Sequence, residues 1–162
     1  MSRWALNALL TVLGKRLARA SEADSDFRAA LSRDVTIVVE AGDVVHHYST
    51  RDRTITAARG APSEAVPPEA LCTLKFTTTG KALRALSSRN RVNKIIANML
   101  DQTAQVEGDI MLLLWFECRI QHVMPIGNQK RPPVRFEGAY AAPRDDIKAA
   151  SWITREPAVE AL

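Results

Sequence analysis

The side chains best suited to metal binding or nucleophilic chemistry are three histidines and two cysteines. His46 and His47 are adjacent in a segment with strand-like composition, so their side chains point to opposite faces and cannot serve one metal as a pair. His122 has no cysteine or carboxylate at ligand spacing, and Cys72 and Cys118 form no CxxC or Cys/His pattern. We therefore predict no metal or catalytic role for these residues.

Motifs that would indicate catalysis are missing from the sequence, which has no GxSxG, P-loop, GxGxxG, HExxH or EF-hand pattern. Glu107 and Asp109 could form an acid/base pair, but Asp109 is better explained as the N-cap of the apolar segment that follows. No nucleic-acid-binding pattern is present either. The sequence favours a protein that is not an enzyme, needs no cofactor and binds no nucleic acid.

Length and composition indicate one folded domain with a substantial core. The chain has 162 residues, of which 46% are hydrophobic and 25% charged, as in ordinary globular proteins. The net charge of +4 mildly favours anionic partners. Two locally basic stretches, Lys15–Arg19 and Arg84–Lys94, are expected to be solvated helical faces.

The first twenty residues superficially imitate a secretory signal, with Arg3 before an apolar run from Trp4 to Leu13. Lys15, Arg16 and Arg19 then stand where a signal peptide is normally uncharged. No apolar run approaches the roughly 20 residues needed to span a bilayer. We expect a soluble protein with a cytoplasmic location.

Hydrophobic periodicity predicts helices before and after a β-meander. The first helix carries a leucine stripe and a short helix should follow from Asp24 to Leu31, with Ser21 or Asp24 as its cap. We expect the leucine stripe to dock on a sheet, although its basic neighbours would also suit an anionic membrane. The stripe consists of Leu6, Leu9, Leu10, Leu13 and Leu17.

The strand pattern begins at Val35, where alternation predicts a half-buried strand. Gly42-Asp43 suits a type II′ hairpin turn, so residues 44–50 should return antiparallel, with a third strand at 54–58. Later elements are a strand near residues 72–77, helices carrying Leu83 and Leu86 and then 92–100, a strand at 103–107, and a helix from Asp109 that is apolar on every side. Residues 125–162 contain several prolines and are expected to be an irregular C-terminal extension, with a helix near 145–153.

The order of these segments resembles the sterol carrier protein type 2 domain. The similarity covers roughly residues 6–124 and is carried by Cys72-Thr73-Leu74-Lys75-Phe76, two amphipathic helices, and Gln105-Val106-Glu107-Gly108-Asp109 before the apolar helix. The sequence departs from the family at Leu71, where an acidic residue is frequent, and at Asp101-Gln102, where a Gly-Lys type turn is usual.

The resemblance implies an α/β (α+β) fold, with a five-stranded, mainly antiparallel sheet covered by helices that enclose a hydrophobic tunnel. Residues 1–124 would then be the lipid-binding domain. From the residues alone, an ordinary filled core is equally compatible. Met111 and Trp115 are spaced i, i+4 and so share one helix face. The predicted lining residues are Phe76, Leu83, Leu86, Ile96, Met99, Met111, Leu114 and Trp115.

The leading functional hypothesis is non-catalytic binding or transfer of a lipid or fatty-acyl ligand, with peripheral membrane contact left open. An accessory or scaffold role in isoprenoid quinone biosynthesis is the first alternative, because some relatives in the family have that role. A homodimerisation module without ligand is the second, by similarity to the domain appended to some alkyl sulfatases.

Overall fold

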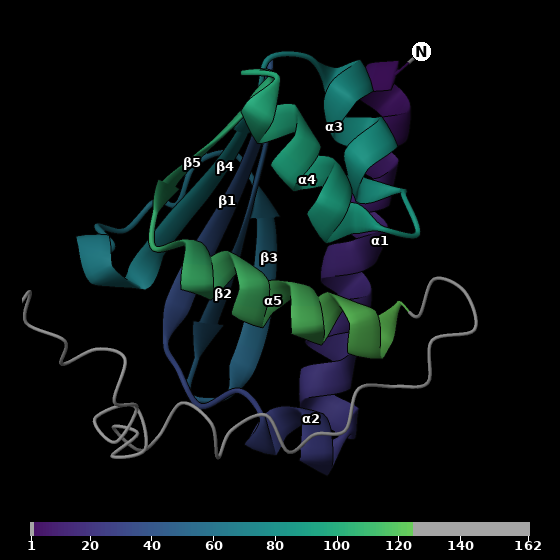
Figure 1. Ribbon diagram of the computed structural model, residues 1–162. Coiled ribbons are helices and arrows are strands. Elements are labelled where there is room, and N and C mark those ends of the chain that lie inside the picture. Colours follow the sequence, from purple (N-terminus) through teal and green to yellow (C-terminus); the bar gives the residue numbers. More distant parts are fainter. Residues whose placement is uncertain (1, 125–162) are drawn as a thin grey trace, which may run out of the picture. The chain divides into compact units, whose positions relative to one another are not determined.

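The structure is a computed structural model that describes residues 2–124, so the predicted C-terminal extension and the helix expected near 145–153 lie outside the described residues. The described residues form helices that pack on a single β-sheet (Figure 1). In chain order the elements are α1 Ser2–Ala23, α2 Ser25–Ala29, β1 Val35–Ala41, β2 Val44–Arg51, β3 Thr54–Arg59, the 3-10 turn η1 Pro68–Ala70, β4 Leu71–Phe76, α3 Thr79–Leu86, α4 Arg91–Leu100, β5 Ala104–Gly108 and α5 Ile110–Val123.

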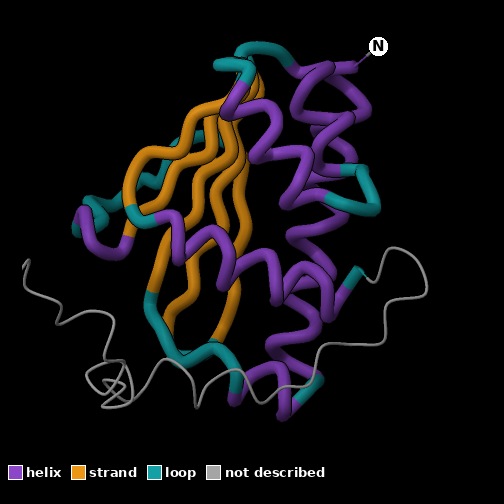
Figure 2. The backbone as a smooth tube through the Cα atoms, in the orientation of Figure 1, coloured by secondary structure: helices purple, strands orange, loops and turns teal. Residues whose placement is uncertain are grey.

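The five strands form one mixed sheet in the order β3-β2-β1-β4-β5. Only the central pair, β1 and β4, is parallel, and the other neighbours are antiparallel. The helices gather on one side of this sheet (Figure 2). The α+β fold with a five-stranded, mainly antiparallel sheet covered by helices is therefore confirmed.

Helix α1 docks on the sheet as predicted. Leu6, Leu10, Leu13 and Leu17 are all buried in the core, and the helix packs mainly against β3. Gly14 makes this close approach feasible, because a Cβ at that position would lie 2.5 Å from the Cβ of Ala57. The leucine stripe is thus covered by the protein itself.

Side-chain caps fix the starts of three helices. Asp24 accepts hydrogen bonds from the backbone N–H groups of Asp26 and Phe27, Thr78 accepts from Lys81, and Asp109 accepts from Met111. Of the two caps considered for α2, the structure selects Asp24. Ser21 instead accepts a hydrogen bond from the backbone N–H of Ile55 and so ties α1 to β3.

The two hairpin turns of the meander have different backbone conformations. Gly42 has a φ of +61°, as the first central position of the predicted type II′ turn requires. In the loop between β2 and β3, Asp52 and Arg53 both have positive φ, at 49° and 59°. That loop therefore places an arginine in a conformation that favours glycine or asparagine.

Two burial expectations differ from the structure. Strand β1, the central strand of the sheet, is buried on both faces, including Thr36 and Val38. Helix α5 is apolar on every side, which predicts burial on more than one side, yet Ile110, Met111 and Leu114 are exposed. Of these, Ile110 and Leu114 line a groove together with residues of α4. Among residues 2–124, no helix combines the length and the hydrophobicity needed to cross a membrane.

Candidate functional site

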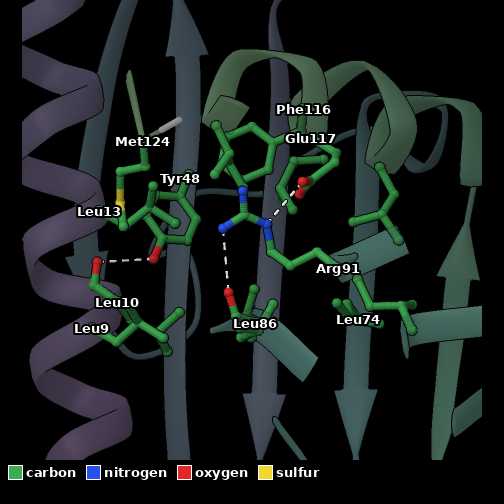
Figure 3. Close-up of a pocket in the computed structure, with 15 residues that line it drawn as sticks. Leu9, Leu10, Leu13, Tyr48, Leu74, Leu86, Arg91, Phe116, Glu117 and Met124 are labelled. Carbon is green, nitrogen blue, oxygen red and sulfur yellow. Dashed lines mark hydrogen bonds and ion pairs between the residues drawn. The ribbon is translucent and has the colours of Figure 1, made fainter. Parts of the chain in front are cut away.

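A cavity lies between the helices and the sheet (Figure 3). Its lining is almost entirely apolar and comes from α1, β1, β2, β4, α4 and α5 together with the end of α3. The lining residues are Leu9, Leu10, Leu13, Ile37, Val39, Tyr48, Leu74, Leu86, Arg91, Ile95, Leu113, Phe116, Glu117, Ile120 and Met124.

The cavity is small, at about 30 Å³. Such a volume holds on the order of one water molecule, whereas sites for drug-sized ligands measure about 300–1,000 Å³. Core side chains therefore fill most of the space that the predicted tunnel would occupy.

A second apolar pocket opens on the outside of the helix layer, between α4 and α5. It has a volume of about 90 Å³ and is lined by Val92, Ile95, Ile96, Met99, Ile110, Leu113, Leu114 and Glu117. Ile95, Leu113 and Glu117 line both this groove and the internal cavity. These three side chains therefore lie at the boundary between the two spaces.

A buried ion pair stands at this boundary. Arg91 donates from Nε to Glu117 Oε1 at 2.8 Å and from a terminal nitrogen to the carbonyl of Leu86 at 3.3 Å. Arg91 and Glu117 are each only 6% exposed. Since a buried ion pair gains little net stability over well-packed apolar residues, its position in an apolar wall points to a role beyond packing.

The sequence analysis missed this ion pair. Arg91 falls within the stretch Arg84–Lys94 that was predicted to be a solvated face, and for Arg91 that prediction is wrong because the helix turns it inward toward Glu117. The available signal was Glu117, the one acidic residue within α5. A carboxylate on an otherwise apolar helix needs a cationic partner if it is buried.

Tyr48 is the other polar side chain of the cavity wall. Its hydroxyl donates a hydrogen bond to the carbonyl of Leu10 at 3.0 Å, and its ring packs on Phe116 with centroids 5.2 Å apart. Burial raises the pKa of Tyr48 well above its ordinary value. The phenol is therefore neutral and already committed to a structural hydrogen bond.

The predicted lining residues divide into three groups. Leu86 lines the internal cavity, while Ile96, Met99 and Leu114 line the outer groove. Phe76 is a buried core residue, and Leu83 and Trp115 are half-buried against the core. Phe76, Leu83, Met111 and Trp115 line neither pocket. Contact of any of the eight with a ligand stays a prediction.

The histidines make local structural contacts. His46 shares a hydrogen bond of 3.0 Å with Asn7 of α1, and His47 one of 2.8 Å with the carbonyl of Gly60. His122 lies 3.1 Å from Asp24, whose pKa is lowered first by the backbone hydrogen bond from Phe27 and then by His122. Within the described residues no three histidine, cysteine or acidic side chains cluster as metal ligands would.

Neither cysteine has the character of a nucleophile. Burial, the main cause, raises the pKa of Cys72 to about 11, and burial likewise raises the pKa of Cys118. Both side chains are therefore neutral thiols at physiological pH, and the thiolate is the reactive form.

Comparison with known proteins yields only distant structural matches. No family model matches the chain, and no curated protein matches it. Among solved structures, the chain is similar to a protein described as the UbiJ-SCP2 ubiquinone synthesis protein, with a TM-score of 0.48 and 16% identity over 73% of this chain and 94% of that one. It is also similar to part of a double mutant of a sec-alkyl sulfatase, with a TM-score of 0.45 and 19% identity over 66% of this chain and 15% of that one. These likenesses concern the fold alone.

Proposed function

We propose that this protein binds a lipid or another apolar ligand, without catalysis, between its helices and its sheet. The observation that carries the proposal is the junction of two apolar spaces, the internal cavity and the α4/α5 groove, which share Ile95, Leu113 and Glu117. Apolar burial would supply the affinity, as in most small-molecule sites.

A ligand of lipid size requires the cavity to expand, and α4 is the element best placed to move. It contacts mainly α3 and β5, and its N-cap residue Asn90 makes no side-chain capping hydrogen bond. A shift of α4 that moves Ile95 away from the boundary while keeping the Arg91–Glu117 pair would join the groove to the cavity. The ligand would then enter between α4 and α5.

The Arg91–Glu117 pair would orient the polar end of the ligand. A guanidinium has five N–H donors, and the structure assigns two hydrogen bonds to those of Arg91. A ligand carboxylate or hydroxyl at the boundary could accept from the remaining donors, while the apolar tail lies along the cavity.

Native mass spectrometry and titration with a fluorescent fatty acid test this function together. The wild-type protein should carry or accept one apolar ligand. Leu113→Trp places bulk at the boundary and should weaken uptake by at least about tenfold, which corresponds to about 1.4 kcal/mol. Met111→Trp on the same helix is the matched control, because Met111 lines neither pocket and is exposed.

The outcomes separate the alternatives weighed from the sequence. Weaker uptake in Met111→Trp with unchanged uptake in Leu113→Trp would favour the lining predicted from helix spacing over the junction described here. No copurified ligand and no uptake by the wild type would remove the carrier function. A stable dimer in that same sample would favour a dimerisation module, and a stable complex with other proteins would favour an accessory role.

A further inference from the structure

Large apolar side chains on the surface concentrate on two neighbouring helices. Five of the seven exposed large hydrophobic residues among those the structure describes lie on α4 and α5. Leu100 is 80% exposed and Ile96 is 46% exposed. We call the surface formed by these five residues the α4/α5 face; it consists of Ile96, Leu100, Ile110, Met111 and Leu114. Ile96, Ile110 and Leu114 also line the outer groove, so the two helices present one continuous apolar surface.

The charged side chains of α3 and α4 are all basic. Between Phe76 and Asp101 the sequence contains no acidic residue. Lys81 and Arg84 on α3, Arg89 before α4 and Lys94 on α4 are exposed, and none of them forms an ion pair with a described residue. Helices α3 and α4 pack against each other, so these cations lie on or next to α4 and on the helix packed against it.

The acidic residues closest in sequence to the face are largely committed elsewhere. Glu107 pairs with Lys75 at 2.7 Å, and Asp109 caps α5. Asp101, at the end of α4, is the acidic side chain that remains. The surroundings of the face are therefore predominantly positive.

We propose that the α4/α5 face docks the protein onto an anionic lipid surface. Exposed isoleucine, leucine and methionine side chains would insert at the boundary between headgroups and acyl chains, while the flanking lysine and arginine side chains contact lipid phosphates. A second copy is less well matched, because it would bring a second set of these basic side chains to the same contact.

Helix α1 is a poorer docking surface. Its leucine stripe is buried in the core, which leaves Trp4 and Val12 as its exposed large apolar residues. Arg3, beside Trp4, is already paired with Asp43 at 2.7 Å. These features make α1 a source of matched controls on the same protein.

Flotation of the full chain with vesicles tests the docking face. Vesicles of equal parts phosphatidylglycerol and phosphatidylcholine should bind the wild type more strongly than vesicles of phosphatidylcholine alone. Binding should weaken as salt rises from about 0.15 M to about 1 M, because salt screens exposed charges. The experiment does not depend on ligand uptake, so failure of the docking face and failure of the proposed function are distinguishable.

Two pairs of matched variants locate the contact. Ile96→Glu/Leu100→Glu should reduce vesicle partitioning at least about tenfold, and Trp4→Glu/Val12→Glu should stay within about twofold of wild type. Arg89→Glu/Lys94→Glu should reduce partitioning at least about 25-fold, since each basic residue near an anionic membrane contributes about fivefold. Lys15→Glu/Arg16→Glu changes net charge equally on α1 and should have a much smaller effect.

Three results would overturn the proposal. One is a wild type that does not float with anionic vesicles. Another is equal loss of binding in the α1 and α4 variants, which would mean that only net charge matters. The third is a wild-type dimer that Ile96→Glu/Leu100→Glu dissociates while vesicle binding is unchanged, which would assign the face to a second copy of the chain.

Discussion

The two ends of the helix layer are packed in different ways. Where α1 crosses β3, leucine side chains are fully buried and Gly14 lets the backbones approach closely. Where α4 meets α5, a buried ion pair, a small cavity and a surface groove lie side by side, and several large apolar side chains are exposed. The first region stabilises the fold. The second region combines a cavity, a groove and an exposed apolar surface, which are the features that ligand entry requires.

Breaking the buried ion pair should have the largest effect on stability. Glu117→Leu leaves the Arg91 guanidinium buried without its carboxylate, which we expect to lower the free energy of unfolding by about 3–5 kcal/mol. Replacing both partners, in Arg91→Met/Glu117→Leu, should recover most of that loss because no charge is then buried. Urea denaturation of the two variants and wild type measures the difference. A double variant as unstable as the single one would mean that the pair is needed for folding.

Truncating one leucine at each end of the helix layer contrasts the two regions directly. Leu10→Ala removes a core side chain and should cost about 2–5 kcal/mol. Leu100→Ala should change stability by no more than about 0.5 kcal/mol because that side chain is exposed. Both are measured by denaturant unfolding. A large cost for Leu100→Ala would show that another segment covers α4 in solution.

The close helix–strand contact at Gly14 can be tested by adding one methyl group. Gly14→Ala should destabilise the protein, because a steric cost of roughly 1–3 kcal/mol exceeds the gain in helix propensity of about 1 kcal/mol. Gly80→Ala in α3 is the control, since nothing lies within 4 Å of the Cβ it would add. Thermal melting should show a lower Tm for the first variant and an equal or higher Tm for the second. Equal changes in Tm for the two variants would mean that β3 shifts at little cost to accommodate the added methyl group.

The smallest expected effect is a pH dependence at the α1 end. Burial, with smaller contributions from the charges of Arg59 and His47, lowers the pKa of His46 below its ordinary value of 6.5. The unfolded chain therefore takes up a proton more readily than the folded protein, so stability present above about pH 6.5 is lost as the pH falls. Between about pH 8 and about pH 5, the Tm of His46→Gln should fall by less than the Tm of the wild type. A steeper loss in the variant would contradict this linkage.

The sequence determined the element order because periodicity and capping are local properties. The leucine stripe of α1, the Gly42-Asp43 hairpin and the Asp109 cap are each specified by residues within a few positions of one another. The strand pairing of the meander follows from its short loops. The sequence analysis did not predict the parallel contact of β1 with β4, because no local pattern brings together two strands so distant in sequence.

Only the tertiary structure decided which apolar residues form a wall and which face outward. The sequence predicted a solvated face at Arg91, but the structure buries Arg91 beside Glu117. The sequence predicted that α5 is apolar on every side, but the structure exposes Ile110, Met111 and Leu114. Periodicity identifies the faces of a helix but not what lies opposite each face. Whether an apolar helix bounds a filled core, a cavity or a docking surface depends on how its neighbours pack, and that is set by contacts between residues far apart in the chain.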